Sequence, residues 1–359
     1  MFNPSRLNYA ALGKGIKFKR RDFTRQQLEE NGFGRRNILT SSSKKIILGF
    51  LVLLSVVVIL PIILKSDETV KSISNNPIDA LAVLLIISSI IFYFKWVIDR
   101  LENYQYKLLR FAIDNGLKYG GSYTNKPSAD RIMFSVASRS RFKSDEKVLS
   151  WSKGDYALGR FEYEAGLRHT FAINYMSVKL PRHMPQLFLN SNQNKLNIKT
   201  DTFRVKKLKL EGDFANTFTL YAPPKYAVDA LQVFTPDVMA ALMDHGTQYN
   251  YEILDDRLYI YSLDIFSQYA LAKKETMQNL LESTARLAPE FTHQSKNYRD
   301  VGARTFGENS VADHGARIQK RVWWSRLRPW AKFWIIAYII QLILLAALLI
   351  YLGAIGELT

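Results

Sequence analysis

Hydrophobic residues form three long runs in this chain, over 46–64, 80–94 and 333–356. The first run holds 19 residues without a charge. A helix of that length extends roughly 28 Å, close to the roughly 30 Å hydrocarbon thickness of a bilayer. The pattern therefore predicts three transmembrane helices at 46–64, 80–98 and 333–356, the first two forming a helical hairpin over 46–98.

Apolar residues continue beyond the second run at steps of three and four, which indicates that its helix extends past the polar Lys95. The residues on this face are Leu101, Tyr104, Leu108, Phe111, Ala112 and Leu117, and Gly120-Gly121 follows them. We expect Gly120-Gly121 to end the helix.

Between about 132 and 262 the pattern changes to period two and becomes rich in β-branched and aromatic residues, which predicts strands. A helix follows Thr235, and a longer helix covers 264–287. A hairpin is predicted to turn at Asp255-Asp256, which places one set of side chains on each face of the sheet. The first set is Tyr251, Ile253, Leu258 and Ile260, and the second is Asn250, Glu252, Tyr259 and Tyr261. The fold class is therefore α+β: three transmembrane helices, with a mostly antiparallel β-rich soluble domain between the second and third. The predicted strands are 132–137, 147–151, 156–163, 169–179, 186–189, 205–211, 214–221 and 230–234.

Composition divides the chain further. A basic, flexible cytoplasmic arm is expected over 1–45 and an α+β cytoplasmic domain over 99–288. The segment 289–316 is rich in Gly, Asn, Ser and charge, and is predicted to be a polar linker. The segment 317–332 interleaves cations with tryptophans and predicts an interfacial helix.

The net charge of +17 is concentrated beside the hydrophobic runs. Residues 1–45 carry a net +8 and residues 315–332 a net +6. Positive charge flanking hydrophobic spans is typical of cytoplasmic segments. The sequence therefore predicts a multi-pass plasma-membrane protein with its N-terminus and main domain in the cytoplasm and its C-terminus outside. Its expected partners are a lipid bilayer with anionic headgroups and a protein at the membrane, and the charge distribution argues against nucleic acid.

Side chains that combine charge or an aromatic ring with a position beside a run are expected at the membrane interface. They are Lys44, Lys45, Lys95, Trp96, Arg321, Trp323, Trp324, Arg326, Arg328, Trp330 and Lys332.

Catalytic motifs do not emerge from the sequence. There is no cysteine, no HExxH among the five histidines, no GxSxG and no phosphate-binding loop, so no cofactor or metal is predicted. Asp155, Glu162 and His169 are the candidates for acid–base chemistry because they lie close together in sequence. Glu162 and Glu164 also fit the solvated face of a strand, which is the simpler interpretation.

Several short segments together resemble a bacterial family of membrane-anchored domains of unknown function. They are 154–162 (GDYALGRFE), Leu180-Pro181, 184–189 (MPQLFL), 210–218 (LEGDFANTF), 235–239 (TPDVM) and 258–260 (LYI). The resemblance covers about 46–285 and implies paired N-terminal spans before a β-rich domain. It implies no catalytic residue, and the third hydrophobic run departs from it.

Two functions are consistent with these patterns. The first is a membrane-tethered cytoplasmic domain that acts as a binding or scaffolding module without catalysis. The alternative is an enzyme or ligand-binding sensor at the inner leaflet that acts through 155–169.

Overall fold

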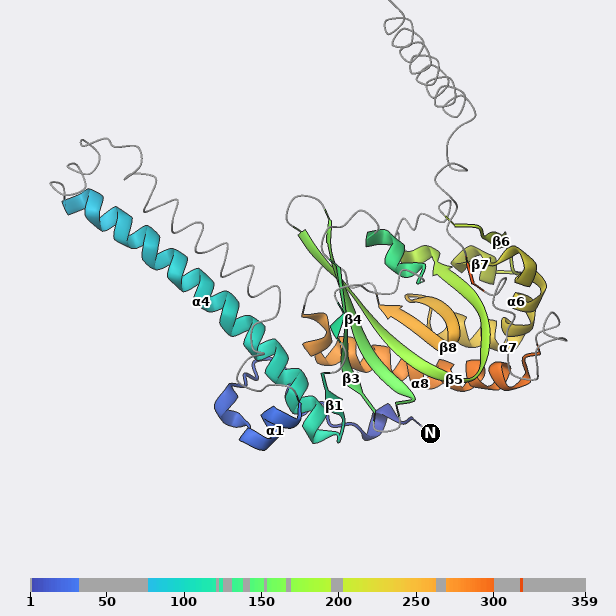
Figure 1. Cartoon of the computed structure of the whole chain (residues 1–359), viewed down its shortest axis with the longest axis horizontal. Coiled ribbons are helices and arrows are strands. Elements are labelled where there is room, and N and C mark those ends of the chain that lie inside the picture. Colours follow the sequence, from blue (N-terminus) through green and yellow to red (C-terminus); the bar gives the residue numbers. More distant parts are fainter. Residues whose placement is uncertain are drawn as a thin grey trace, which may run out of the picture.

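The structure is a computed structural model, and it describes most of the chain between residues 2 and 299. The described residues are 2–31, 77–120, 123–124, 131–137, 143–151, 154–165, 169–194, 203–262, 269–299 and 317–318. Figure 1 shows a curved sheet, helices packed against it, and one long helix that extends away from it.

The prediction of three transmembrane helices is wrong, because no helix in the described part of the chain is long and apolar enough to cross a membrane. Helix α4 (Pro77–Asp114) contains the second run. Its uncharged stretch over 80–94 has 15 residues and extends roughly 22 Å, less than the hydrocarbon thickness. The predicted spans 46–64 and 333–356 lie outside the described residues.

The multi-pass membrane description, the membrane-tethered function and the plasma-membrane localisation with a cytoplasmic main domain all depended on those three helices. Because the three helices are not supported, these three predictions are wrong as well. The α+β character remains, because the described residues contain a mainly antiparallel sheet together with several helices.

In the described part of the chain, eight strands make one sheet in the order β1-β3-β4-β5-β7-β6, with β2 also paired to β3 and β8 paired to β5. Every pairing is antiparallel. The strands are β1 (Lys118–Tyr119), β2 (Tyr123–Thr124), β3 (Lys143–Ser150), β4 (Tyr156–Ala165), β5 (His169–Ser191), β6 (Lys206–Leu208), β7 (Phe218–Ala222) and β8 (Asn250–Ser262).

The hairpin predicted at Asp255-Asp256 is wrong, because β8 runs through both residues and pairs with β5 on either side of them. Asp255 has φ 55°, and the register between the two strands shifts near it. This irregularity places Ile253 and Leu258, five residues apart, on the same side of the sheet. The predicted division of side chains between two faces is therefore confirmed although the turn is absent.

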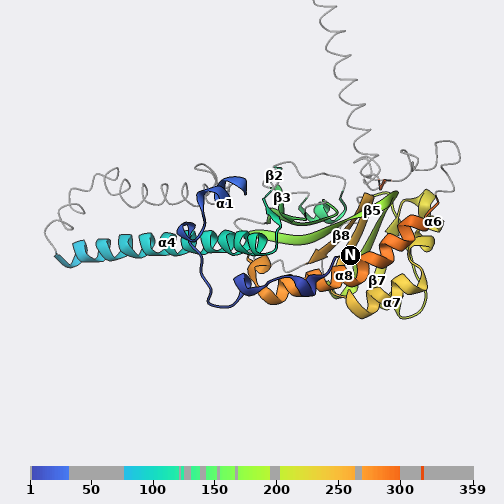
Figure 2. The same cartoon turned by 90° about the horizontal axis from the view of Figure 1, so that it is seen from below.

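The two faces of the sheet have different cores. One face packs against α4, α6 (Ala227–Val233), α7 (Pro236–His245) and α8 (Lys274–Asn297), which supply aliphatic side chains (Figures 1 and 2). The other face, here the aromatic face, is covered by the short helix η4 (Met133–Ala137). Its buried residues include Phe134, Phe161, Tyr163, Tyr175, Phe188, Tyr259 and Tyr261.

Local helices replace several predicted strands. Residues 133–137 form η4, residues 230–233 belong to α6, and α5 (Phe214–Thr217) precedes β7. Short apolar segments do not distinguish a strand from one buried turn of helix.

The helix predicted after Thr235 is confirmed as α7. The last helix α8 starts and ends later than predicted, so residues 289–297 of the expected linker belong to it. Three further short helices follow β5, β7 and β8 in the sequence: η5 (Asn192–Asn194), η7 (Pro224–Tyr226) and η8 (Ala270–Ala272).

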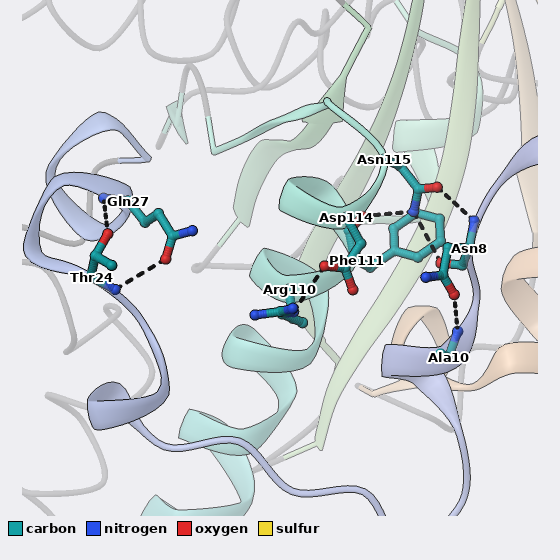
Figure 3. A network of polar contacts seen from close by, with 8 residues as sticks. All are labelled: Asn8, Ala10, Thr24, Gln27, Arg110, Phe111, Asp114 and Asn115. Atoms are coloured by element: carbon teal, nitrogen blue, oxygen red, sulfur yellow. Dashed lines mark hydrogen bonds and ion pairs between the residues drawn. The ribbon is translucent and has the colours of Figure 1, made fainter.

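The N-terminal residues are folded against α4 and differ from the flexible arm expected for 1–45. Over 2–31 they form η1 (Pro4–Arg6), η2 (Ala10–Leu12), η3 (Arg20–Asp22) and α1 (Arg25–Glu30). Asn115 accepts a hydrogen bond from the Asn8 backbone N–H at 2.6 Å and donates to the Asn8 carbonyl at 3.0 Å (Figure 3). Leu12, Phe23 and Leu28 are buried in the contact.

The predicted continuation of the second helix beyond Lys95 is confirmed. Tyr104, Leu108, Phe111 and Ala112 are buried in the aliphatic core as part of α4. The helix ends at Asp114, and Gly116 with φ 63° follows it, so the end comes several residues before Gly120-Gly121.

Candidate functional site

The structure does not bring the three acid–base candidates together. Asp155 lies in the turn that precedes β4, whereas His169 begins β5 and pairs with Ala165 at the far end of β4. The nine-residue step from 156 to 165 corresponds to roughly 30 Å along the strand. Among the described residues, no group of three or more His, Asp or Glu side chains could hold a metal ion.

Glu162 is not on a solvated face. Its carboxylate forms an ion pair with the Arg160 guanidinium, and its side chain is 19% exposed. Arg160 lies 5.1 Å from the ring centroid of Tyr104 on α4, and Glu146 of β3 is its cross-strand neighbour. Burial raises the pKa of the Glu146 carboxyl, Arg160 lowers it, and Glu162 and Asp145 raise it further. We name Glu146, Arg160, Glu162 and Tyr104 the helix-side cluster.

A second buried arginine lies on the aromatic face, on the opposite side of β3. The Arg131 guanidinium donates to Asp145 at 3.1 Å, and Tyr175 donates to the same carboxylate at 2.7 Å. The rings of Phe134, Tyr175 and Tyr259 lie 4.2–4.8 Å from the guanidinium carbon. These five residues are named the aromatic-side cluster.

A glycine makes room for the Tyr175 side chain in this cluster. Gly159 is the cross-strand neighbour of Tyr175, and a Cβ at Gly159 would lie 2.1 Å from the Tyr175 ring. Glycine inside a strand often marks such a close approach. Gly159 within the predicted strand 156–163 was therefore a signal of this cluster in the sequence.

Glu252 of β8 adjoins the aromatic-side cluster, because it binds the backbone of Ile132, the residue after Arg131. Its carboxylate accepts from the Ile132 N–H at 2.7 Å and from Gln186 at 2.7 Å, and also from Tyr261 at 3.0 Å. Burial raises the pKa of Glu252, and these hydrogen bonds lower it. The carboxylate therefore fixes η4 over the sheet, which is a structural role.

A concentration of exposed positive charge lies where the N-terminal residues cross α4. Lys14, Lys17, Lys19, Arg20 and Arg21 are all exposed. The segment is held in place because the Phe18 N–H donates to Asn103 at 3.0 Å and Lys107 donates to the Gly13 carbonyl at 2.9 Å. Lys14 is 4.0 Å from Glu275, and the other four form no ion pair among the described residues.

Helix α4 continues this surface beyond the crossing. Trp96 and Arg100 lie on the same helical face as Asn103 and Lys107, because the steps of four, three and four residues match the helical period. The Arg100 guanidinium carbon is 5.3 Å from the Trp96 ring centroid. Trp96 is 49% exposed and Phe92, one turn further, is 72% exposed.

These residues form one surface, here the basic belt. The seven-residue step from Trp96 to Asn103 corresponds to roughly 10 Å along α4, so its two halves are adjacent. It joins cations and apolar side chains from segments about 80 residues apart in the sequence. The members of the belt are Lys14, Ile16, Lys17, Lys19, Arg20 and Arg21 from the N-terminal segment, and Phe92, Lys95, Trp96 and Arg100 from α4.

The belt contains two of the predicted membrane-interface residues, Lys95 and Trp96. The others lie outside the described residues: Lys44, Lys45, Arg321, Trp323, Trp324, Arg326, Arg328, Trp330 and Lys332. The sequence pattern identified the N-terminal cations as a group. It gave no indication that they are held in a fixed position against α4.

Comparison of the chain with protein-family models, with curated proteins and with solved structures finds no match in any of the three. The resemblance to a bacterial family of membrane-anchored domains therefore stays a prediction, and no residue role is transferred to this chain.

Proposed function

We propose that the basic belt binds a surface of anionic lipid headgroups, so that the chain acts as a lipid-surface-binding module. The observation that carries this proposal is the folded contact between the cationic N-terminal segment and the Trp96–Arg100 face of α4. Binding of the belt to the lipid surface requires no helix that crosses the bilayer.

Electrostatic attraction supplies the first part of the binding. A Lys or Arg held near an anionic lipid surface contributes about 1 kcal/mol. The eight residues 14–21 of the belt include five exposed cations, and the acid Asp22 follows them directly. Because the hydrogen bonds to Asn103 and from Lys107 already order this segment, binding requires little further loss of conformational entropy.

Exposed apolar side chains distinguish lipid from other polyanions. Ile16 is 37% exposed beside the cations, and Phe92 and Trp96 are exposed on α4. Tryptophan is enriched at lipid–water interfaces because its ring is amphipathic. RNA or an acidic protein would satisfy the cations but would offer little to an aliphatic side chain such as Ile16.

Vesicle co-sedimentation of the full chain tests the proposal. We expect strong binding to vesicles of phosphatidylcholine and phosphatidylglycerol in equal parts, and little binding to pure phosphatidylcholine. The double variant K17E/R21E should weaken binding at least about tenfold, because it reverses two charges. The matched variant R286E/K296E reverses two exposed cations in the later turns of α8, away from the Glu275–Lys14 contact, and should bind like the wild type.

Two results would contradict the proposal. One is equal loss of binding in K17E/R21E and R286E/K296E, which would indicate a response to net charge alone. The other is tighter binding to an RNA of equal charge than to the anionic vesicles, which would identify a nucleic acid as the ligand.

A further inference from the structure

The sheet ends in a strand that carries a second concentration of cations. Strand β6 is the terminal strand of the sheet and pairs only with β7 in the described part of the chain. Lys206 and Lys207 are exposed on this strand, and Arg204 and Lys209 are exposed on either side of it. No ion pair among the described residues includes any of these four, which we name the basic edge.

Buried residues on either side hold β6 in place. Phe203 and Leu210 are 2% and 8% exposed, and Leu208 packs against the aliphatic core opposite Leu220. The strand is therefore fixed while its outer side carries backbone groups that no described strand pairs. Alternate residues of a strand direct their N–H and C=O groups away from the existing neighbour.

The register shows how the cations are distributed. Lys206 is opposite Ala222, which belongs to the aliphatic core, and Lys207 is opposite Tyr221, which packs against the aromatic face. Neighbouring residues of a strand point to opposite faces. The basic edge therefore presents one lysine on each side of the sheet at its rim.

We propose that the basic edge binds an extended acidic segment of a partner protein, which adds to the sheet as a strand beside β6. Cross-strand neighbours on one face lie about 5 Å apart, so two consecutive acidic residues in the added strand can meet Lys206 and Lys207 on opposite faces. Recognition thus requires both the acidic pair and free backbone groups, as in other cases of strand addition.

Lysine on an edge strand also prevents unwanted pairing between copies of a protein. That role predicts no binding to an acidic strand, so the binding of an acidic peptide distinguishes the two roles. Four cations lie within the six residues 204–209. The acids nearest in sequence are Asp201, before Arg204, and Glu211, after Leu210, and neither belongs to β6.

Fluorescence anisotropy of the full chain with three labelled peptides tests the proposal. The first peptide is Thr-Val-Thr-Glu-Glu-Thr-Val-Thr, and the second has Gln-Gln in place of Glu-Glu. The third, Thr-Val-Pro-Glu-Glu-Pro-Val-Thr, keeps the charge but cannot form the backbone ladder. We expect the first to bind at least tenfold more tightly than the other two, with protection of the β6 amides from hydrogen exchange.

Variants separate this surface from the basic belt. K206E/K207E should weaken binding of the first peptide at least tenfold, whereas R286E/K296E and K17E/R21E should leave it unchanged. Equal binding of the proline peptide would reduce the contact to charge alone and overturn strand addition. Unchanged peptide binding in K206E/K207E would show that the basic edge is not the peptide site, independently of the result of the vesicle experiment.

Discussion

The two buried arginines differ in what they connect, although both pair with acids and lie against aromatic rings. Consecutive residues of β3 point to opposite faces, so Asp145 meets Arg131 on the aromatic face while Glu146 neighbours Arg160 on the helix side. Arg131 connects the sheet to η4, the segment directly after it. Arg160 connects the sheet to α4, which is distant in sequence.

The surroundings of the two ion pairs also differ. Arg131 and Asp145 are 11% and 10% exposed, and three rings enclose the guanidinium. On the helix side, the Glu162 side chain is 19% exposed. Burial raises the pKa of the neighbouring Glu146. Loss of one arginine should therefore leave an isolated buried charge on the aromatic side, but only partly desolvated carboxyl groups on the helix side.

The largest expected effect is that of R131M. Removing one partner of a buried pair leaves the other uncompensated, so we expect the free energy of unfolding to fall by about 3–5 kcal/mol. Urea denaturation measures this change. R286M, at an exposed position on α8, should change it by less than about 0.5 kcal/mol.

A second variant tests the cause of this loss. If the unpaired Asp145 carboxylate is responsible, R131M/D145N should recover part of the stability lost in R131M. No recovery would indicate that stacking on the rings, rather than the ion pair, makes Arg131 important.

R160M is expected to have a smaller effect, about 1–3 kcal/mol, because Glu162 remains partly hydrated. Hydrogen exchange should locate the change: amides near Tyr104 in α4 become less protected in R160M, and those of η4 in R131M. Loss of protection in the same segment for both variants would contradict the division between the two clusters.

The smallest effect is a pH dependence on the helix side. Burial raises the pKa of Glu146 above its ordinary value of 4.5. Its proton is thus bound more tightly in the folded protein, so its contribution to stability is present below about pH 4.5 and is lost as pH rises through the folded pKa. E146Q stays neutral, and we expect its stability relative to wild type to increase between about pH 4 and pH 7.

The buried Glu252 does not obscure this comparison. Its pKa is also raised, but it is present in both proteins, so its contribution cancels in the difference between E146Q and wild type. A difference that is constant across this pH range would show that Glu146 titrates as it does in the unfolded chain.

Much of the candidate site could be read from the sequence, but its assembly could not. The cations before residue 22 and the pair Lys95–Trp96 are evident as local patterns. Their placement in one belt depends on hydrogen bonds such as that between Phe18 and Asn103, whose partners are 85 residues apart. The basic edge was missed for a similar reason, since strand order alone makes β6 terminal.

The sequence by itself determined the alternation of faces within each half of β8, the continuation of α4 beyond Lys95, and helix α7 after Thr235. These depend on alternation, helical period and capping, which are local. Tertiary structure decided that β8 continues through Asp255, that the apolar residues 133–137 and 230–233 are helical, and that Glu162 is paired with Arg160. Each of these depends on a partner distant in the chain or on burial that outweighs local propensity.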